Sequence, residues 1–294
     1  MADPQGPVLV IGATGQQGGA AARQLLDRGR KVHALVRSPG SPAAESLRAA
    51  GATLVPGDLD DVDSLRAAMS GVQGVFLVLT MLTGAKVTDE GVAAEERRGK
   101  AAAEVAAEAG IKHLVYSSIS GAGVVKDIPY YDSKAAIEER IDALGLPVTV
   151  LRPVMFMENF TNLTRPAVTD GELVLSLAVP PEARVRLIAT RDIGAFAAIA
   201  FEQPGSYLGS RIEIAGDCLT GPEIAAAFGR ACGLPARFQQ APIERVRAFD
   251  EQVAKMFEWV GSRDDDEPDF PALRAAHPGL LTLETWLDTT GWKP

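Results

Sequence analysis

The first half of the sequence alternates short runs of β-branched residues with longer segments rich in Ala and Leu. This alternation is typical of βαβ units, in which a helix carries the chain back to begin the next parallel strand. The run Val75–Leu79 is apolar throughout, as expected for a strand that helices cover on both faces. We therefore predict an α/β fold with a doubly wound parallel sheet between Val8 and Arg152.

The predicted sheet holds six strands joined by five helices. The strands are expected at Val8–Ile11, Lys31–Val36, Thr53–Pro56, Gly74–Thr80, His113–Ser117 and Val148–Leu151. The helices are expected at Gln17–Arg28, Ala43–Ala50, Asp61–Met69, Gly91–Ala109 and Ser133–Leu144. In such a fold, ligands bind in the crevice beyond the carboxyl ends of the strands, so we expect the functional residues in the loops there.

After Pro153 the elements become shorter and more mixed. The predicted strands are Leu173–Val179, Val185–Ile188 and Arg211–Ala215, and the predicted helices lie near Asp192–Phe201, Pro222–Cys232 and Pro242–Val260. Thr220 and Glu223 have the spacing of a capping box at a helix start. We predict two domains, residues 1–153 with the sheet and residues 154–294 as a smaller α+β lobe. The two are expected to interleave into one compact unit with a ligand cleft between them.

Composition excludes several classes of protein. A chain of 294 residues with 47% apolar residues is long enough for a large domain with a smaller lobe. No stretch approaches the roughly 20 apolar residues that span a bilayer, and the first residues lack the basic region of a signal peptide. A soluble protein of the cytoplasm, without a membrane segment, is the expectation.

Net charge and the positions of possible metal ligands exclude further classes of protein. The net charge is −9, and the densest basic cluster is only Arg97, Arg98 and Lys100, so direct binding to nucleic acid is disfavoured. Cys218 and Cys232 are the only cysteines, and the three histidines stand far apart in the sequence. Neither a disulfide framework nor a metal centre is predicted.

A glycine-rich loop lies between the first predicted strand and the first predicted helix. A glycine motif indicates a phosphate-binding loop only when it follows a strand and opens a helix, and this one does. Gly12 permits a tight turn, Gly15 lets backbone N–H groups approach a pyrophosphate, and Gly18 lets helix and strand pack closely. The predicted cofactor-binding residues of this loop are Gly12, Thr14, Gly15, Gln16, Gln17 and Gly18. The sequence therefore predicts a Rossmann-type dinucleotide site.

The end of the second strand distinguishes the two nicotinamide dinucleotides. An acidic residue there accepts from the ribose 2′-hydroxyl of NAD, whereas a cation meets the 2′-phosphate of NADP. This chain has Arg37 followed by Ser38. A guanidinium pairs with a phosphate through two parallel hydrogen bonds, and a serine adds a hydroxyl. NADP(H) is the predicted cofactor, with an unliganded surface arginine as the alternative.

Taken with these residues, the chain resembles the NmrA-like family of atypical short-chain dehydrogenases/reductases, nearly from end to end. The resemblance is carried by Gly57-Asp58-Leu59-Asp60-Asp61, Val115-Tyr116-Ser117-Ser118, Asp132-Ser133-Lys134, Glu138, Leu151-Arg152-Pro153, Phe156-Met157-Glu158-Asn159 and the terminal Leu281-Thr282-Leu283-Glu284-Thr285-Trp286-Leu287.

The resemblance implies positions for the cofactor's parts. Asp58 and Leu59 would lie beside the adenine, Thr80 near the inner ribose, and Lys134 on the nicotinamide ribose. The segment from Phe156 to Asn159 would run along the nicotinamide. Arg97 would approach the phosphates, although a solvated helix face would carry the same residue.

The sequence also holds candidate catalytic residues. Tyr130 and Lys134 have the Tyr-x-x-x-Lys spacing of short-chain dehydrogenases, which places a phenol and an ammonium on one face of a helix. Ser117 lies thirteen residues before Tyr130. Pro129 leaves open whether Tyr130 lies inside the helix, and the resembling family commonly lacks this tyrosine. Tyr130 is therefore either a proton donor or an aromatic of the core or cleft, and Lys134 either contacts cofactor or is a surface lysine.

The remaining candidate residues are apolar. Met81, Leu82, Met155, Met157 and Phe160 follow predicted strands, where they would either enclose a planar apolar substrate or form core between the domains.

Two functions are the main hypotheses from this sequence, and a structural or interaction protein with a vestigial site is a third, which the intact phosphate loop disfavours. The first is an NADPH-dependent reductase that transfers hydride to an apolar carbonyl, quinone or imine. The second is a non-catalytic NADP(H)-binding redox sensor that regulates a protein partner. The segment Met81–Glu90 is the candidate for an element that orders on binding. The sequence leaves the oligomeric state open, with a homodimer as one option.

Overall fold

The computed structural model describes residues 6–162 and 164–294. Residues 1–5, which begin the first predicted domain, lie outside this part. The chain forms two compact units. Of the described residues, 6–152 and 190–213 belong to unit 1, and 153–162, 164–189 and 214–294 belong to unit 2. Residues 190–213, which we predicted as part of the C-terminal lobe, thus belong to the unit that carries the sheet.

Unit 1 is built on a seven-stranded sheet with the order β13-β8-β7-β4-β1-β2-β3. Its strands are β1 (Val8–Ile11), β2 (Val32–Val36), β3 (Thr53–Pro56), β4 (Gly74–Val78), β7 (His113–Ser117), β8 (Val148–Pro153) and β13 (Arg211–Ile214). Strand β1 lies between β2 and β4 and is parallel to both, with Val8 opposite Val32 and Gly74. The predicted doubly wound α/β fold is confirmed, and β1 is where the strand order reverses, which is where such folds bind ligands.

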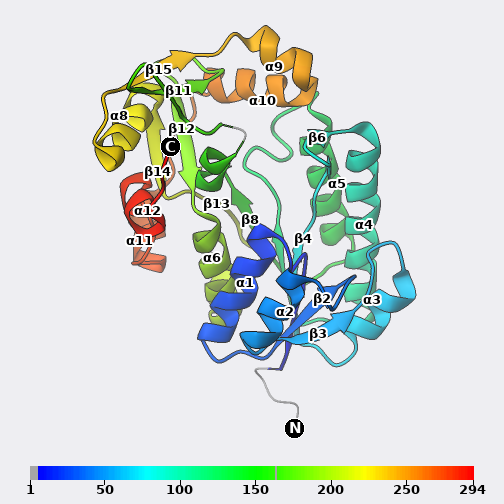
Figure 1. Cartoon of the computed structure of the whole chain (residues 1–294). Coiled ribbons are helices and arrows are strands. Elements are labelled where there is room, and N and C mark those ends of the chain that lie inside the picture. Colours follow the sequence, from blue (N-terminus) through cyan, green and yellow to red (C-terminus); the bar gives the residue numbers. More distant parts are fainter. Residues whose placement is uncertain (1–5, 163) are drawn as a thin grey trace. The chain divides into compact units, whose positions relative to one another are not determined.

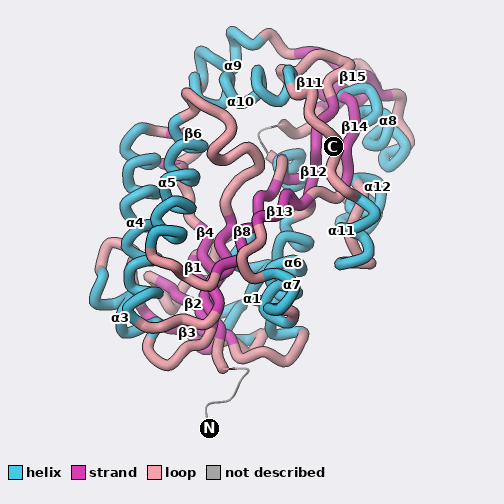
Figure 2. Tube along the Cα trace, turned by 180° about the vertical axis from the view of Figure 1, so that it is seen from behind, coloured by secondary structure: helices cyan, strands magenta, loops and turns pink. Residues whose placement is uncertain are grey.

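Helices cover both faces of this sheet (Figures 1 and 2). They are α1 (Gln16–Asp27), α2 (Pro42–Ala49), α3 (Val62–Met69), α4 (Asp89–Glu108), α5 (Pro129–Ala143), α6 (Thr190–Glu202) and α7 (Pro204–Tyr207). Helices α1 and α6 pack together on one face, so closely that a Cβ on Gly194 would lie 2.5 Å from the carbonyl carbon of Ala20. Helices α3, α4 and α5 lie on the other face (Figure 2).

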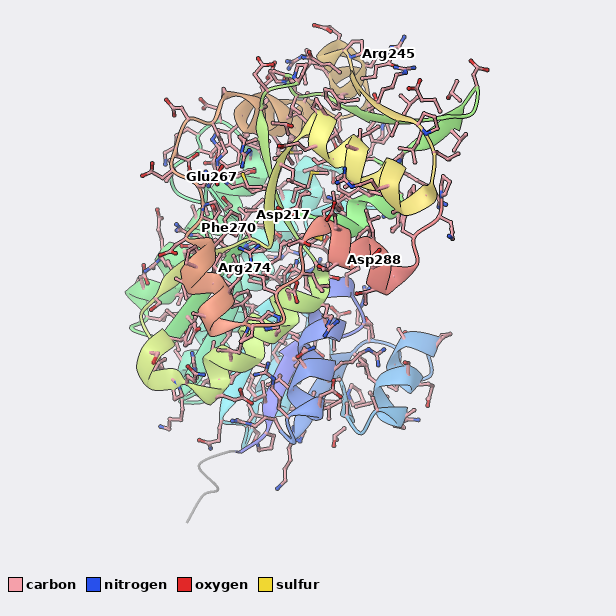
Figure 3. All side chains as sticks on the ribbon, turned by 90° about the vertical axis from the view of Figure 1, so that its left-hand side faces the viewer. Asp217, Arg245, Glu267, Phe270, Arg274 and Asp288 are labelled. Atoms are coloured by element: carbon pink, nitrogen blue, oxygen red, sulfur yellow. The ribbon has the colours of Figure 1, made fainter. Side chains whose placement is uncertain are left out.

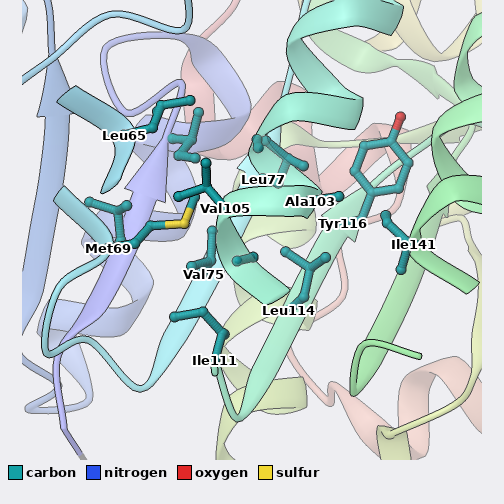
Figure 4. Packing of buried hydrophobic residues seen from close by; sticks show 14 of the residues in the cluster. Leu65, Met69, Val75, Leu77, Ala103, Val105, Ile111, Leu114, Tyr116 and Ile141 are labelled. Carbon is teal, nitrogen blue, oxygen red and sulfur yellow. The ribbon is translucent and has the colours of Figure 1, made fainter. Parts of the chain in front are cut away.

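The core between the sheet and α3, α4 and α5 is shown in Figure 4. Helix α3 contributes Leu65 and Met69, and the strands contribute Leu77, Leu114 and Tyr116, all of them buried. The small residues of α4 let that helix lie close to the strands. Burial of this apolar surface stabilises the unit at roughly 25 cal/mol per Å² removed from water.

Helix α5 and the central sheet of unit 1 differ from the prediction. Helix α5 begins at Pro129, four residues before the predicted start at Ser133, because proline is well suited to the first helical turn, where its missing N–H costs no hydrogen bond. The sheet also gains β13 as a seventh strand. The N–H of Val150 in β8 donates to the carbonyl of Ser210, just before β13, at 2.9 Å, so this strand extends the sheet instead of joining the C-terminal lobe.

Unit 2 contains short strands and six helical segments among its described residues. Its strands are β9 (Met155–Phe156), β10 (Ala167–Thr169), β11 (Glu172–Leu177), β12 (Arg184–Ile188), β14 (Asp217–Thr220) and β15 (Ala236–Gln240). Its helices are η1 (Met157–Thr161), α8 (Gly221–Cys232), α9 (Ile243–Phe249), α10 (Glu251–Ser262), α11 (Phe270–Ala276) and α12 (Leu283–Thr290). The strands form two three-stranded sheets, β10-β11-β15 and β14-β12-β9.

Capping explains where two helices of unit 2 begin. The predicted capping box is confirmed, because Thr220 accepts from the N–H of Glu223 and the Glu223 carboxylate accepts from the N–H of Thr220. The single helix predicted for Pro242–Val260 is in fact α9 followed by α10. Asp250 separates them because its extended backbone ends α9 while its carboxylate accepts from the first N–H groups of α10.

Polar contacts around Asp217 attach the C-terminal helices within unit 2 (Figure 3). The Asp217 carboxylate accepts from the N–H of Leu283 at 2.9 Å, at the start of α12. The Arg274 guanidinium of α11 donates to the carbonyl of Gly216 at 3.2 Å and lies 5.1 Å from the ring centre of Phe270.

Across the described residues, none of the helices combines the length and the apolar character needed to cross a membrane.

Candidate functional site

The glycine-rich loop between β1 and α1 has the geometry that its sequence predicts. Gly12 adopts a φ of +76°, which favours glycine, and a Cβ there would lie 2.7 Å from a methyl of Val78. A Cβ on Gly18 would lie 2.1 Å from the carbonyl oxygen of Gly12. The N–H of Gly15 donates to that same carbonyl at 2.9 Å. Gly12 therefore makes the turn, and Gly18 lets α1 start against it.

The first turn of α1 is suited to an anion. Its N-cap residue is Gly15, which has no side chain to accept from the first N–H groups, and no acidic residue lies in this turn. Helices α2, α3 and α4, by contrast, are capped by Ser41, Asp61 and Thr88. An uncapped helix start presents free N–H groups and the positive end of the helix dipole, which together bind phosphate. Thr14, Gln16 and Gln17 complete this loop.

A hydrogen bond joins the loop to the end of β7. The Ser117 hydroxyl, which is buried, donates to the side-chain oxygen of Gln17 at 2.6 Å. The sequence predicted Ser117 as a catalytic residue and did not predict this contact. In the structure the single hydroxyl proton of Ser117 is therefore directed at the phosphate-loop glutamine.

Arg37 and Ser38 directly follow β2, as predicted. The Arg37 side chain is exposed, and no residue within 6–162 or 164–294 forms an ion pair or hydrogen bond with its guanidinium. The carbonyl of Ser38 accepts from the N–H of Ser41, which starts α2. Arg37 is thus an unpaired cation at the strand end where the two dinucleotides are distinguished.

The loop after β3 is ordered by its own acidic residues. Asp58 accepts through its carboxylate from the N–H of Asp60 at 3.0 Å, and Leu59 packs partly buried against the core. The Asp60 carboxylate in turn receives the guanidinium groups of Arg98 and Arg97, the latter at 3.0 Å. The hydrogen bonds from Arg98 and then Arg97 lower the pKa of Asp60 well below its usual range.

These contacts bear on the predicted role of Arg97. Its side chain is 64% exposed and forms an ion pair with Asp60. The structure places Arg97 on α4 opposite the loop after β3, engaged by a carboxylate, and does not place it on the phosphate loop. A phosphate contact by Arg97 stays a prediction.

The residues after β4 form a small hairpin of β5 (Leu82–Thr83) and β6 (Lys86–Val87). The Thr80 hydroxyl accepts from the N–H of Leu82 at 3.1 Å and so shapes the turn into the hairpin. The Leu82 side chain is 47% exposed. Gly91 of α4 packs on the carbonyl of Met81, where a Cβ would lie 2.2 Å from the oxygen. The segment predicted as an ordering element is therefore a hairpin anchored at Met81.

Tyr130 lies inside α5, which answers the question that Pro129 left open in the sequence. Tyr130 and Lys134 are both inside α5, one turn apart, and both are buried. The Lys134 ammonium donates to the carboxylate of Glu95 at 2.7 Å, and the Tyr130 ring packs on Tyr131 with centres 4.9 Å apart. Lys134 is thus not a surface lysine, and it forms an ion pair with Glu95, a partner that the sequence did not predict.

Glu95 had a signal in the sequence. The buried residues of α4 follow helical spacing and are otherwise small or apolar. An acidic residue within such a stripe indicates a buried partner of opposite charge. Glu95 is 0% exposed and so has that partner in Lys134.

A second buried carboxylate, that of Glu138 on α5, has a structural role. Glu138 accepts from the Ser118 hydroxyl at 2.6 Å, from Arg152 at 2.6 Å and from Arg211 at 3.2 Å. These contacts tie α5 to β8, to β13 and to the residue that follows β7. The phenol of Tyr116 is also buried, and burial together with the charges of Glu95 and Glu138 raises its pKa well above its usual value.

The remaining predicted residues lie in unit 2. Met157 and Phe160 are fully buried in its core, where Phe160 packs edge-on against Phe228. This placement favours core packing over a substrate contact for both residues. Met155 and Phe156 are half-buried in β9.

Asn159 is also half-buried, in η1, and its carbonyl accepts from Asn162 and Thr164. Its contact with a cofactor, like that of Phe156, stays a prediction.

Within the described residues, no group of three or more His, Cys, Asp and Glu side chains is arranged to hold a metal ion.

The sheet order and the glycine loop that opens α1 define a protein of the Rossmann class. The chain belongs to the NmrA-like family, whose model matches residues 4–289, as its motifs indicated.

Proteins similar to this chain include enzymes and a regulator. The NAD(P)H azoreductase of Xenophilus azovorans is 30% identical over 243 residues, which cover 82% of this chain and 79% of the azoreductase. The structure of NmrA, a negative transcriptional regulator, in complex with NADP matches with a TM-score of 0.80 at 24% identity and covers 97% of this chain and 94% of NmrA.

An NADPH-dependent quinone oxidoreductase from Escherichia coli matches with a TM-score of 0.77 at 21% identity and covers 97% of this chain and 99% of the oxidoreductase. At these identities the two structures support the fold alone.

Proposed function

We propose that this protein is an NADPH-dependent reductase that transfers hydride to an apolar carbonyl, quinone, imine or azo compound. The proposal depends on two features of unit 1 that occur together, the uncapped start of α1 at Gly15 and the guanidinium of Arg37, which has no ion-pair partner among the described residues. An uncapped helix start binds a pyrophosphate, and a free guanidinium at this strand end binds a 2′-phosphate. Membership of a family that includes an NAD(P)H azoreductase supports the same reading.

The residues of unit 1 fit NADP(H) by their chemistry. Gly12 and Gly18 form a turn that a side chain would fill, and Arg37 adds the cation that NAD does not need. When bound, the nicotinamide supplies a hydride to an electrophilic acceptor. Lys134, which lies on α5 beyond the carboxyl end of β7, would donate from its ammonium to a ribose hydroxyl. Tyr130 or solvent would supply the proton where negative charge develops on the acceptor.

A test of the reductase activity follows directly. Purified protein is mixed with NADPH and a panel of acceptors, namely an azo dye, a quinone, an enone and an imine, and loss of reduced-nicotinamide absorbance is recorded. The proposal predicts turnover with at least one acceptor that Lys134→Met reduces strongly. The matched control is Lys100→Met, since Lys100 pairs with Glu96 on the surface of α4, and this variant should keep its activity. No turnover above a control without protein would refute catalysis, and equal turnover by Lys134→Met and the unaltered protein would refute the role of Lys134.

A second candidate function is regulation, since NmrA, which shares this fold, is a negative transcriptional regulator whose structure is in complex with NADP. In this reading the chain is a redox sensor that regulates a protein partner. Sensing requires that oxidised and reduced cofactor stabilise different conformations. Oligomeric state and partner capture would then differ between protein without cofactor, with NADP⁺ and with NADPH. Identical behaviour in all three conditions would exclude the sensor.

A further inference from the structure

A buried ion pair lies in the contact surface of α4 and α5. Glu95 is 0% exposed, and the Lys134 side chain is 7% exposed. One carboxylate oxygen of Glu95 accepts from the Lys134 ammonium at 2.7 Å, and the other accepts from the Ser133 hydroxyl at 2.7 Å. Two successive residues of α5 thus hold both oxygens of a single carboxylate.

The close approach of the two helices makes this pair possible. Gly99 lies one turn after Glu95 on the same face of α4, and a Cβ there would lie 2.5 Å from the Ile137 side chain. Ile137 lies one turn after Ser133 on α5. The glycine therefore lets α5 pack directly on α4, and the turn before it places Glu95 opposite Ser133 and Lys134.

Two other ion pairs of α4 are different in kind. Lys100 and Glu96 form a pair along α4, and Arg140 and Glu104 form one between the helices, all with side chains at least 37% exposed. Exposed pairs of this type contribute little to stability. A buried pair is costly to desolvate, and apolar residues of similar size often replace it without loss of stability. Stability alone therefore does not explain the pair of Glu95 with Lys134.

We propose that Glu95 is a positioning residue that holds Lys134 for the cofactor. The inference rests on the proposed function, in which Lys134 contacts the nicotinamide ribose. An ammonium has three donors, and the contact with Glu95 uses one of them. The carboxylate also offsets the positive charge, so Lys134 acts as an oriented hydrogen-bond donor.

The experiment measures the dissociation constant of NADPH by nicotinamide fluorescence, which does not depend on turnover. Glu95→Gln keeps an oxygen that accepts from Lys134 but removes the negative charge, and it should weaken binding roughly tenfold because a charge-assisted hydrogen bond is about twice as strong as a neutral one. Lys134→Met should weaken it by at least as much. Because Glu95 acts through Lys134, the double variant should bind no more weakly than Lys134→Met alone. The matched control is Glu96→Gln, which changes the neighbouring exposed carboxylate and should bind as the unaltered protein does.

The outcomes separate this inference from the proposed function. If Lys134→Met weakens binding while Glu95→Gln does not, or if the two losses multiply in the double variant, the positioning role is refuted and the cofactor site stands. If the unaltered protein binds no NADPH, the proposed function itself fails. Should Glu95→Gln not fold, Ser133→Ala removes the hydroxyl that holds the other carboxylate oxygen. That variant must then weaken NADPH binding, and unchanged binding would overturn the proposal.

Discussion

His113 gives unit 1 a pH-dependent stability. Its side chain in β7 is 6% exposed and packs edge-on against Phe201, with ring centres 5.2 Å apart. The Thr149 hydroxyl donates its proton to the carbonyl of Tyr207 at 2.8 Å. The Thr149 oxygen can therefore only accept from Nε2 of His113, also at 2.8 Å. The folded protein therefore holds the neutral ring with its proton on Nε2.

The magnitude follows from the position of the pKa. Burial lowers the pKa of His113 from 6.5 to about 4. Between these values the unfolded chain binds a proton that the folded protein does not, so the stability is complete above pH 6.5 and declines as the pH falls towards about 4. A difference of this size corresponds to roughly 3 kcal/mol in the free energy of unfolding.

The assay is urea unfolding between neutral pH and the acid end of this window. Unfolding is followed by far-ultraviolet circular dichroism, because all three tryptophans lie in unit 2 and would not report on unit 1. His113→Gln keeps an N–H donor for Thr149 but cannot gain a proton. The free energy of unfolding of the unaltered protein should therefore fall more steeply with acid than that of the variant, by most of the roughly 3 kcal/mol. Parallel curves for the two proteins would refute the reasoning.

Two further predictions concern packing and charge in unit 1. Gly194→Ala should lower the free energy of unfolding by roughly 1–3 kcal/mol, because the new methyl group meets the backbone at Ala20 and this outweighs the better helix propensity of alanine. The control Gly205→Ala should be neutral, since nothing lies within 4 Å of a Cβ at that position. Equal melting temperatures for the two variants would contradict the close packing of α1 and α6. Arg97→Gln should change NADPH affinity less than about twofold, because Asp60 already engages that guanidinium; a loss of tenfold or more by fluorescence titration would instead assign Arg97 to the phosphates.

Local patterns predicted most of unit 1. The apolar runs that form β1, β3 and β7 and the glycine loop are specified by neighbouring residues, and they lie where the sequence placed them. The start of α5 was predicted too late because Pro129 both ends extended segments and begins helices, and only the surrounding structure decides between these roles. That decision matters, since it brings Tyr130 into the helix with Lys134.

Long-range contacts explain what the sequence did not predict. Strand β13 lies in the part of the sequence after residue 153, where the elements become shorter and more mixed. Its place in the sheet involves a hydrogen bond between Val150 of β8 and Ser210, which are far apart in the sequence. Glu95 meets Lys134 across 39 residues, and Ser117 meets Gln17 across 100. Such pairs arise from the packing of elements and leave only an indirect trace in spacing.

The measurement that tests the central claim most directly compares the dissociation constants of NADPH and NADH at low salt, for the unaltered protein and for Arg37→Glu. Arg48→Gln serves as the control, since Arg48 is an exposed arginine of α2 paired with Glu45. We predict that the unaltered protein and the control bind NADPH at least roughly tenfold more tightly than NADH, and that Arg37→Glu loses this preference while it still binds NADH. Equal affinity for the two cofactors in the unaltered protein, or an unchanged preference in Arg37→Glu, would contradict the account.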